Sequence, residues 1–296
     1  MKNILTSLAC IAISFCITSF ALDTSAKSSD EHGHEHGEDC SIDHSSEEKR
    51  SANFVGGNSS DLDFSEMTSS YEAWNSYQKE NIELTTDFIP VDTNGEEISK
   101  KTFLEKLLTG KYIPVKLFDA EYMYQLYTLD GDADEKITKA IKTSSNIVYS
   151  YFLKEDGAFP EFNFTDLNGN NYTSNNTKGQ IIVIECWFIQ CTSCIQEFPK
   201  LNDLYDKYEE YEDLQFLSLA FDSADRLKKF LIKKEFRYPV IPDQKDFIKN
   251  QIQVKHYPTH IILDEYGNVK KMVNNADALS LALSNIMNTG LLEDEL

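Results

Sequence analysis

Two cysteines, Cys191 and Cys194, stand three positions apart directly after an apolar run, in the stretch IIVIECWFIQCTSCIQEF. A pair with this spacing can be a structural disulfide, half of a metal site, or a redox pair that opens and closes during catalysis. A disulfide between them would close a very short loop and would stabilise the fold little through chain entropy. The spacing therefore favours redox chemistry over a structural role.

The segments on either side of the two cysteines predict how they are positioned. The apolar run 180–188 predicts a buried strand, and residues 192–211 predict a helix that Pro199 kinks. Cys191 would then lie at a helix N-terminus, where free N–H groups and a partial positive charge favour the thiolate and lower the thiol pKa. Cys194, one turn into the helix, would be shielded and could resolve a mixed disulfide.

The rest of the C-terminal region alternates strand and helix patterns. After the cysteine helix we expect a strand at 214–221, an amphipathic helix at 223–235, two strands within 260–273 joined by a turn at 264–267, and a closing helix at 276–288. This order predicts an α/β domain over 156–291, with a mixed sheet flanked by helices.

Residues 71–155 predict a smaller α+β accessory domain. Aromatic residues are frequent there, and the patterns indicate a helix at 98–110, a strand at 112–118 and a longer helix at 133–154. The stretch LDGDADEKI faintly resembles a calcium loop, but Glu135 and Ile141 occupy the positions that require glycine and glutamate. We interpret it as a turn and helix cap. This domain carries no catalytic pattern and could recognise a partner.

The first 26 residues predict an export signal. Lys2 precedes an uncharged, mostly apolar run, and small residues follow at the end of that run. The run of about 18 residues is near the lower limit for a membrane span, so an uncleaved membrane anchor is the alternative. We expect an exported or periplasmic protein, from which cleavage would remove Cys10 and Cys16.

Residues 27–70 predict a disordered, acidic, histidine-rich linker, because so few apolar residues cannot offset the entropy of ordering. Weak transition-metal binding is the functional alternative for this linker, although the spacing fits no defined zinc module; its candidate ligands are His32, His34, His36 and His44. The net charge of the chain, -21, argues against a nucleic-acid partner.

Further residues of the C-terminal domain stand in the order of a known family. Residues 156–291 resemble the TlpA/ResA-like disulfide reductases, exported bacterial proteins with a thioredoxin fold of the AhpC/TSA–Redoxin-like kind. The shared features are Pro160 and Phe162, Asp166 and Gly169, Lys178 and Gly179, Trp187, the CxxC, Pro199, and the segment HYPTHIILDEYGNV. The chain departs from the family at Gln190, where tryptophan is frequent, and at the intervening pair Thr192–Ser193, which lacks the usual proline.

The resemblance implies roles for individual residues. Glu185 occupies the place of a buried carboxylate that takes the proton from the second cysteine, and Pro258 that of a cis proline facing the CxxC. Tyr257 and Trp187 would line the substrate groove. Ser218 stands in place of the lysine that often neighbours the carboxylate, so Glu185 would lack a cationic partner, have a raised pKa and act as a base near neutral pH.

The resemblance also implies an activity. The chain is expected to be an exported thiol–disulfide oxidoreductase without a cofactor, with disulfide-containing proteins as substrates and a membrane or periplasmic electron donor. Oxidases and isomerases share this architecture, and the resemblance alone favours a reductase. The alternative is a metal-binding or metal-delivery protein that uses the histidine-rich tail and the CxxC, with His256 or His260 beside it.

Overall fold

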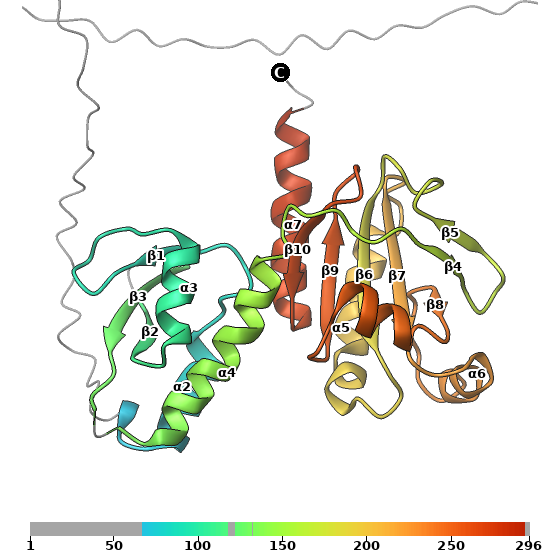
Figure 1. Cartoon of the computed structure of the whole chain (residues 1–296). Coiled ribbons are helices and arrows are strands. Elements are labelled where there is room, and N and C mark those ends of the chain that lie inside the picture. Colours follow the sequence, from blue (N-terminus) through green and yellow to red (C-terminus); the bar gives the residue numbers. More distant parts are fainter. Residues whose placement is uncertain (1–66, 118–121, 132, 294–296) are drawn as a thin grey trace, which may run out of the picture. The chain divides into compact units, whose positions relative to one another are not determined.

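A five-stranded mixed sheet forms the centre of the C-terminal region (Figure 1). The computed structural model describes residues 67–117, 122–131 and 133–293. The sheet order is β10 (Val269–Val273), β9 (Thr259–Leu263), β6 (Ile181–Trp187), β7 (Leu214–Ala220) and β8 (Val240–Ile241). Strands β6, β7 and β8 are parallel, whereas β9 is antiparallel to both β6 and β10. The mixed sheet predicted from the sequence is confirmed.

Helices and loops cover both faces of this sheet. The helices are α5 (Thr192–Tyr208), which contains Pro199 as predicted, α6 (Ala224–Leu231) and α7 (Ala276–Glu293), and a π-helical segment spans Phe247–Ile252. Side chains of β6 alternate between two hydrophobic clusters. Val183 and Trp187 pack in the cluster that includes α5 residues, whereas Cys186 packs in the opposite one. The apolar run is therefore a central strand that is buried on both faces.

A short hairpin precedes the central strand, and the sequence analysis did not assign its strands. Strands β4 (Asn163–Thr165) and β5 (Asn171–Thr173) are joined by the turn at Asp166 and Gly169. The Asp166 carboxylate accepts hydrogen bonds from the backbone N–H groups of Asn168 and Asn170. Gly169 has a φ of 89°, which a side chain would disfavour. The motif expected at this place is thus a real turn.

The preceding region is an α+β arrangement with its own hydrophobic cluster. It contains α2 (Tyr71–Asn81), α3 (Lys100–Leu108) and α4 (Glu135–Phe152). Its three-stranded sheet has the order β1 (Ile89–Val91), β3 (Met123–Thr128), β2 (Tyr112–Lys116). The Asp134 carboxylate caps α4 by accepting from the Lys136 N–H at 2.8 Å, as the interpretation of LDGDADEKI as a turn and cap predicted.

Polar contacts, one of them fully buried, join this region to the C-terminal sheet. The Tyr151 hydroxyl on α4 lies 2.6 Å from the Thr259 hydroxyl on β9. The Lys271 ammonium on β10 lies 2.7 Å from an oxygen of Asp87 and 3.1 Å from one of Glu155. The described residues belong to one compact unit of the chain, and the expected domain boundary at 155–156 stays a prediction.

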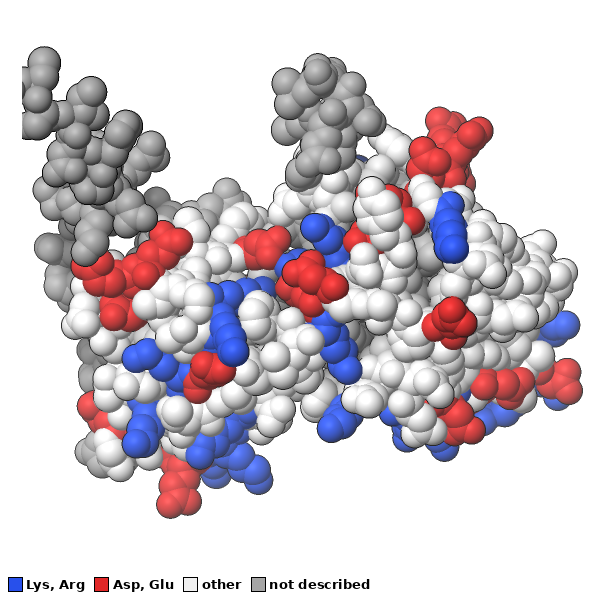
Figure 2. Space-filling view, turned by 45° about the horizontal axis from the view of Figure 1, so that its top comes forward, with Lys and Arg blue, Asp and Glu red and all other residues white. Residues whose placement is uncertain are grey.

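The surface carries charges of both signs. On the face shown in Figure 2, lysine and arginine side chains are interspersed with aspartate and glutamate. In the part of the chain that the structure describes, no helix combines the length and apolarity needed to cross a membrane. The expected signal segment and the four tail histidines lie outside the described residues.

Candidate active site

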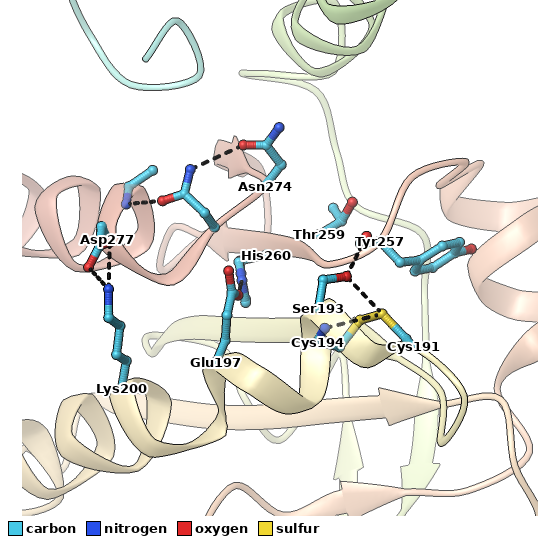
Figure 3. Close-up of polar contacts among 12 residues, drawn as sticks. Cys191, Ser193, Cys194, Glu197, Lys200, Tyr257, Thr259, His260, Asn274 and Asp277 are labelled. Atoms are coloured by element: carbon cyan, nitrogen blue, oxygen red, sulfur yellow. Dashed lines mark hydrogen bonds and ion pairs between the residues drawn. A yellow bond between two sulfur atoms is a disulfide. The ribbon is translucent and has the colours of Figure 1, made fainter. Parts of the chain in front are cut away.

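Cys191 and Cys194 are joined by a disulfide at the start of α5 (Figure 3). Cys191 is the N-cap residue of this helix and follows the last residue of β6 by four positions. The backbone N–H of Cys194 points at the Cys191 sulfur, with a nitrogen–sulfur distance of 3.2 Å. Cys191 keeps 5% of its surface exposed and Cys194 none. The expected division between an accessible first cysteine and a shielded second one is therefore present.

The loop before β9 lies against this pair. The Ser193 hydroxyl is 3.5 Å from the Cys191 sulfur and 3.5 Å from the Tyr257 carbonyl oxygen (Figure 3). The Tyr257–Pro258 peptide bond is cis, as the resemblance implied. The Tyr257 ring packs edge-on against Phe188 and Phe221. Tyr257 is thus held near the cysteine pair by two rings that directly follow β6 and β7.

Trp187 has a different place from the one expected for it. Its side chain is fully buried, stacks edge-on against Phe198 with ring centroids 5.0 Å apart, and donates its indole N–H to the Ser218 hydroxyl at 3.1 Å. A side chain without exposed surface does not line an open groove. Trp187 instead supports the cysteine loop from within the core.

Glu185 is a buried carboxyl group without a hydrogen-bond partner. Neither of its oxygens has a partner among the described residues, and its side chain is completely buried. Its neighbours in the sheet are Ser218 on β7 and His260 on β9. Burial raises the pKa of Glu185 well above its usual range, and the negative charge of Glu197 raises it further. Alternation along β6 places Glu185 on the sheet face of Val183 and Trp187, where both cysteines also pack.

His260 and Glu197 form a pair that the sequence analysis did not find. His260 is fully buried on β9, and its Nε2 lies 3.0 Å from a carboxylate oxygen of Glu197 on α5. The sequence signal available was that Glu197 follows Cys194 by three positions, which places it on the next turn of the same helix. Because Glu197 is turned toward β9, this pair lies beside the redox site.

The metal alternative finds no support at the described part of the site. His256 is exposed on the loop, whereas His260 is buried and bonded to Glu197. Among the residues that the structure describes, no three or more His, Cys, Asp and Glu side chains gather in an arrangement that could hold a metal ion.

Cys186 is a free thiol on the opposite face of the sheet from the cysteine pair, as expected. It is fully buried, and burial together with the nearby Glu185 charge raises its thiol pKa. A buried thiol with a raised pKa forms little thiolate, so Cys186 is a core residue rather than a third reactive cysteine.

Comparisons with known proteins agree with this geometry. Residues 156–272 match the family model described as the AhpC/TSA family. The thiol-disulfide oxidoreductase ResA of Geobacillus kaustophilus is 26% identical over 132 residues, which cover 43% of this chain and 76% of that protein. The ResA protein of Bacillus thuringiensis subsp. konkukian is 30% identical over 125 residues, which cover 40% of this chain and 72% of that protein.

The chain is also similar to solved structures. One is the thioredoxin domain of a thiol-disulfide oxidoreductase from Bacteroides vulgatus, with 21% sequence identity and a TM-score of 0.41. That match covers 45% of this chain and 96% of the solved domain.

Proposed function

This chain belongs to the ResA-like family of thiol-disulfide oxidoreductases, and from that premise we propose that it reduces disulfide bonds of exported proteins through Cys191 and Cys194. Disulfide exchange itself is the activity of the family. We further propose that electrons flow from this chain to its substrate, that the chain acts outside the cytoplasm, and that a membrane or periplasmic donor supplies the electrons. The expected signal segment, residues 1–26, supports the location.

One observation carries the choice of Cys191 as the attacking group. It caps α5, and the Cys194 backbone N–H points at its sulfur from 3.2 Å. A helix N-terminus offers unpaired N–H groups and a partial positive charge, both of which stabilise a thiolate relative to a thiol. Cys191 also keeps the only exposed surface of the pair. Once the disulfide is reduced, Cys191 is therefore the more nucleophilic and the more accessible sulfur.

The exchange then proceeds in two displacements. The Cys191 thiolate attacks one sulfur of the substrate disulfide, the other substrate sulfur leaves as a thiolate, and a mixed disulfide forms. Cys194 loses its proton to the Glu185 carboxylate and attacks the Cys191 sulfur. The second substrate thiolate leaves, so the substrate gains two electrons and Cys191–Cys194 becomes a disulfide. A dithiol donor must return two electrons to the pair before the next cycle.

Glu185 is suited to the role of base because of its environment. Its buried carboxyl group lies on the sheet face of the cysteines, and its pKa is raised by burial and by Glu197. A carboxylate with a raised pKa accepts a thiol proton more readily near neutral pH than an exposed carboxylate does.

The loop at Tyr257 and Pro258 supplies the proposed substrate surface. Proline offers no N–H, and the neighbouring backbone can pair with an extended segment of the substrate in the manner of an added strand. Residues 71–155 would form a separate accessory domain that selects substrates. The contact between Tyr151 and Thr259 gives that region a direct connection to the active-site loop.

Trapping of the mixed disulfide tests the proposal. Reduced Cys194→Ser protein, mixed with a peptide that contains a disulfide, should accumulate a covalent adduct on Cys191, because the resolving thiol is gone. The matched Cys191→Ser protein should form no adduct on Cys194, because that cysteine is fully buried. Mass spectrometry of acid-quenched samples measures both. Equal adduct formation by the two variants would show that the assignment of the two roles is incorrect.

A further inference from the structure

A row of polar side chains crosses the sheet beside the redox site. Glu185 on β6 lies directly opposite His260 on β9 in the antiparallel pairing. Opposed residues of an antiparallel pair have Cβ atoms about 5 Å apart and point to the same face. That face is the one on which the cysteine pair and α5 pack. The imidazole of His260 is therefore an immediate neighbour of the buried carboxyl group.

Several buried polar atoms of this row have no hydrogen-bond partner among the described residues. Nε2 of His260 contacts Glu197, whereas Nδ1 has no partner within the described part of the chain, and neither oxygen of Glu185 has one. Leaving a buried polar atom unpaired costs roughly 1–3 kcal/mol, so native folds rarely keep several together. Such groups beside an active site are candidates for a functional role rather than a structural one.

Glu197 connects this buried row to the surface. Its side chain retains 18% exposure, while that of His260 has none. Glu185 and Cys194 are likewise fully buried. A proton exchanged between Cys194 and Glu185 has no direct contact with solvent, whereas the hydrogen-bonded pair of His260 and Glu197 extends from the strand position beside Glu185 to a partly exposed carboxylate.

Other charged and titratable groups lie around the row. On α5, Lys200 interacts with Glu197 and forms an ion pair with Asp277 of α7 at 2.7 Å. The buried Tyr238 hydroxyl, which has no hydrogen-bond partner among the described residues, senses the Glu185 charge. None of these groups links Glu185 to solvent as His260 can: His260 lies opposite Glu185 in the sheet, one of its nitrogens contacts the partly exposed Glu197, and the other has no partner among the described residues.

We propose that His260 and Glu197 form a proton relay that links the buried base Glu185 to solvent during disulfide exchange. The inference rests on the proposed function, because it assigns a route to the proton that Glu185 takes from Cys194. His260 and Glu197 are positioning residues in this account: they act through Glu185 and do not touch the substrate.

The relay moves one proton out and one proton in per cycle. When Cys194 becomes part of the disulfide, the proton accepted by Glu185 passes to Nδ1 of His260, and the proton on Nε2 passes to the Glu197 carboxylate and then to water. When the donor dithiol reduces the disulfide, Cys194 leaves as a thiolate and needs a proton. The same groups carry a proton inward, which restores the starting imidazole tautomer.

A pH-jump experiment distinguishes this role from a structural one. Reduced full-length protein is held either at pH 8 or at pH 5, then mixed with peptide disulfide at a final pH of 8. Acid quench and mass spectrometry follow the loss of the mixed disulfide. In the wild-type protein the two rates should agree, because the relay lets Glu185 lose its proton at once. In His260→Gln and Glu197→Gln, the sample held at pH 5 should lose the mixed disulfide about 10-fold or more slowly than the sample held at pH 8. Proton transfer by a positioned group contributes at least that much to a rate.

Internal comparisons make the test independent of damage to the fold. Each variant is its own control, because the sample equilibrated at pH 8 reports any general loss of activity. Glu197→Gln alters a partly exposed side chain and should fold even if His260→Gln does not. Glu209→Gln, which removes an exposed carboxylate at the far end of the same helix, should show no lag. The double variant should lag no more than either single variant, because both act on one path.

Two outcomes would overturn the inference. Equal rates for jumped and equilibrated samples of both variants, with a normal Cys191 adduct, would show that the relay is absent while the proposed function stands. Failure of the wild-type protein to form any Cys191 adduct would instead overturn the proposed function and the relay together.

Discussion

Glu185 and Ser218 lie directly opposite each other on the parallel strands β6 and β7. The position beside the buried carboxyl group therefore holds a hydroxyl group, and this hydroxyl already accepts a hydrogen bond from the indole of Trp187. Glu185 has no hydrogen-bond partner among the described residues, and burial is the main cause of its raised pKa. Ser218 thus brings no positive charge to this carboxyl group, and the role of Glu185 as the base stays a prediction.

Replacement of Glu185 by glutamine should slow resolution of the mixed disulfide and also change the pH dependence of stability. A raised carboxyl pKa means that the folded protein binds the proton more tightly than the unfolded chain does. The stability that this proton contributes is complete below the unfolded pKa of about 4.3 and is lost as the pH rises through the folded value. At pH 8, Glu185→Gln should therefore be more stable than the wild-type protein by more than the ~0.5 kcal/mol of an ordinary surface substitution.

Urea unfolding at pH 4 and pH 8 measures this effect. The stability advantage of Glu185→Gln should shrink at pH 4, where the wild-type carboxyl group is protonated in the folded state and mostly protonated in the unfolded state. Glu209→Gln, an exposed substitution, should show no such trend. An advantage that grew toward pH 4 would contradict a raised pKa at Glu185.

Tyr151→Phe should loosen the active-site loop from the accessory region. The Tyr151 hydroxyl is buried against the Thr259 hydroxyl at 2.6 Å, and Thr259 in turn donates to the His256 carbonyl oxygen at 2.7 Å. Burial is the main cause that raises the pKa of Tyr151 to about 12, so the hydroxyl stays protonated at working pH. Loss of this bond should reduce the free energy of unfolding by about 1 kcal/mol.

Tyr149→Phe on the same helix is the matched control for that change. Its hydroxyl bonds to Glu105 on the exposed surface, where the loss should be near zero. Thermal and urea unfolding compare the two variants, and hydrogen exchange at residues 255–260 reports the loop. Equal stabilities for both variants, with unchanged exchange in the loop, would argue against a supporting role for Tyr151.

Lys271→Met should destabilise the protein by about 2 kcal/mol, because hydrogen bonds to charged groups contribute about that much. Lys271 retains only 9% side-chain exposure and bonds to Asp87 and Glu155. Burial lowers the pKa of Lys271, but the two carboxylates outweigh that effect and raise it overall. The stability from Lys271 should therefore be complete below its unfolded pKa of about 10.4 and be lost as the pH rises through the folded value.

The stability that Asp87 contributes has the opposite pH dependence to that of Lys271. Burial raises the pKa of Asp87, but the hydrogen bond and charge of Lys271 lower it overall, so its contribution disappears as the pH falls through the lowered value. Lys270→Met, the exposed neighbour on β10, is the control and should change stability little. If Lys270→Met and Lys271→Met had the same unfolding midpoints at pH 7, the buried cluster would contribute nothing.

Local patterns predicted the parts of the site that depend on neighbours in sequence. The apolar run 181–187, the helix after Cys191 and the interruption at Pro199 each follow from short-range periodicity or from one residue's backbone preference. The cis bond before Pro258 came from the family resemblance, because no local pattern in the chain specifies it.

Contacts between distant segments could not be predicted in this way. The pair of Glu197 and His260 spans 63 positions, and that of Lys271 and Asp87 spans 184. Each depends on the packing of separate elements on one face of the sheet. The groove role expected for Trp187 came from the family resemblance, whereas the pleat of β6 turns its side chain into the core.

The reduction potential of the Cys191–Cys194 pair tests the central claim most directly. It can be measured by equilibration with dithiothreitol and glutathione buffers on the chain without residues 1–26, with Cys40 replaced by serine and Cys186 by alanine. A reductase should have a strongly reducing potential, near the thioredoxin value of about −270 mV. A value near about −120 mV, at the oxidising end of the thioredoxin-like proteins, would contradict the proposed direction. Absence of any reversible couple would contradict the redox assignment itself.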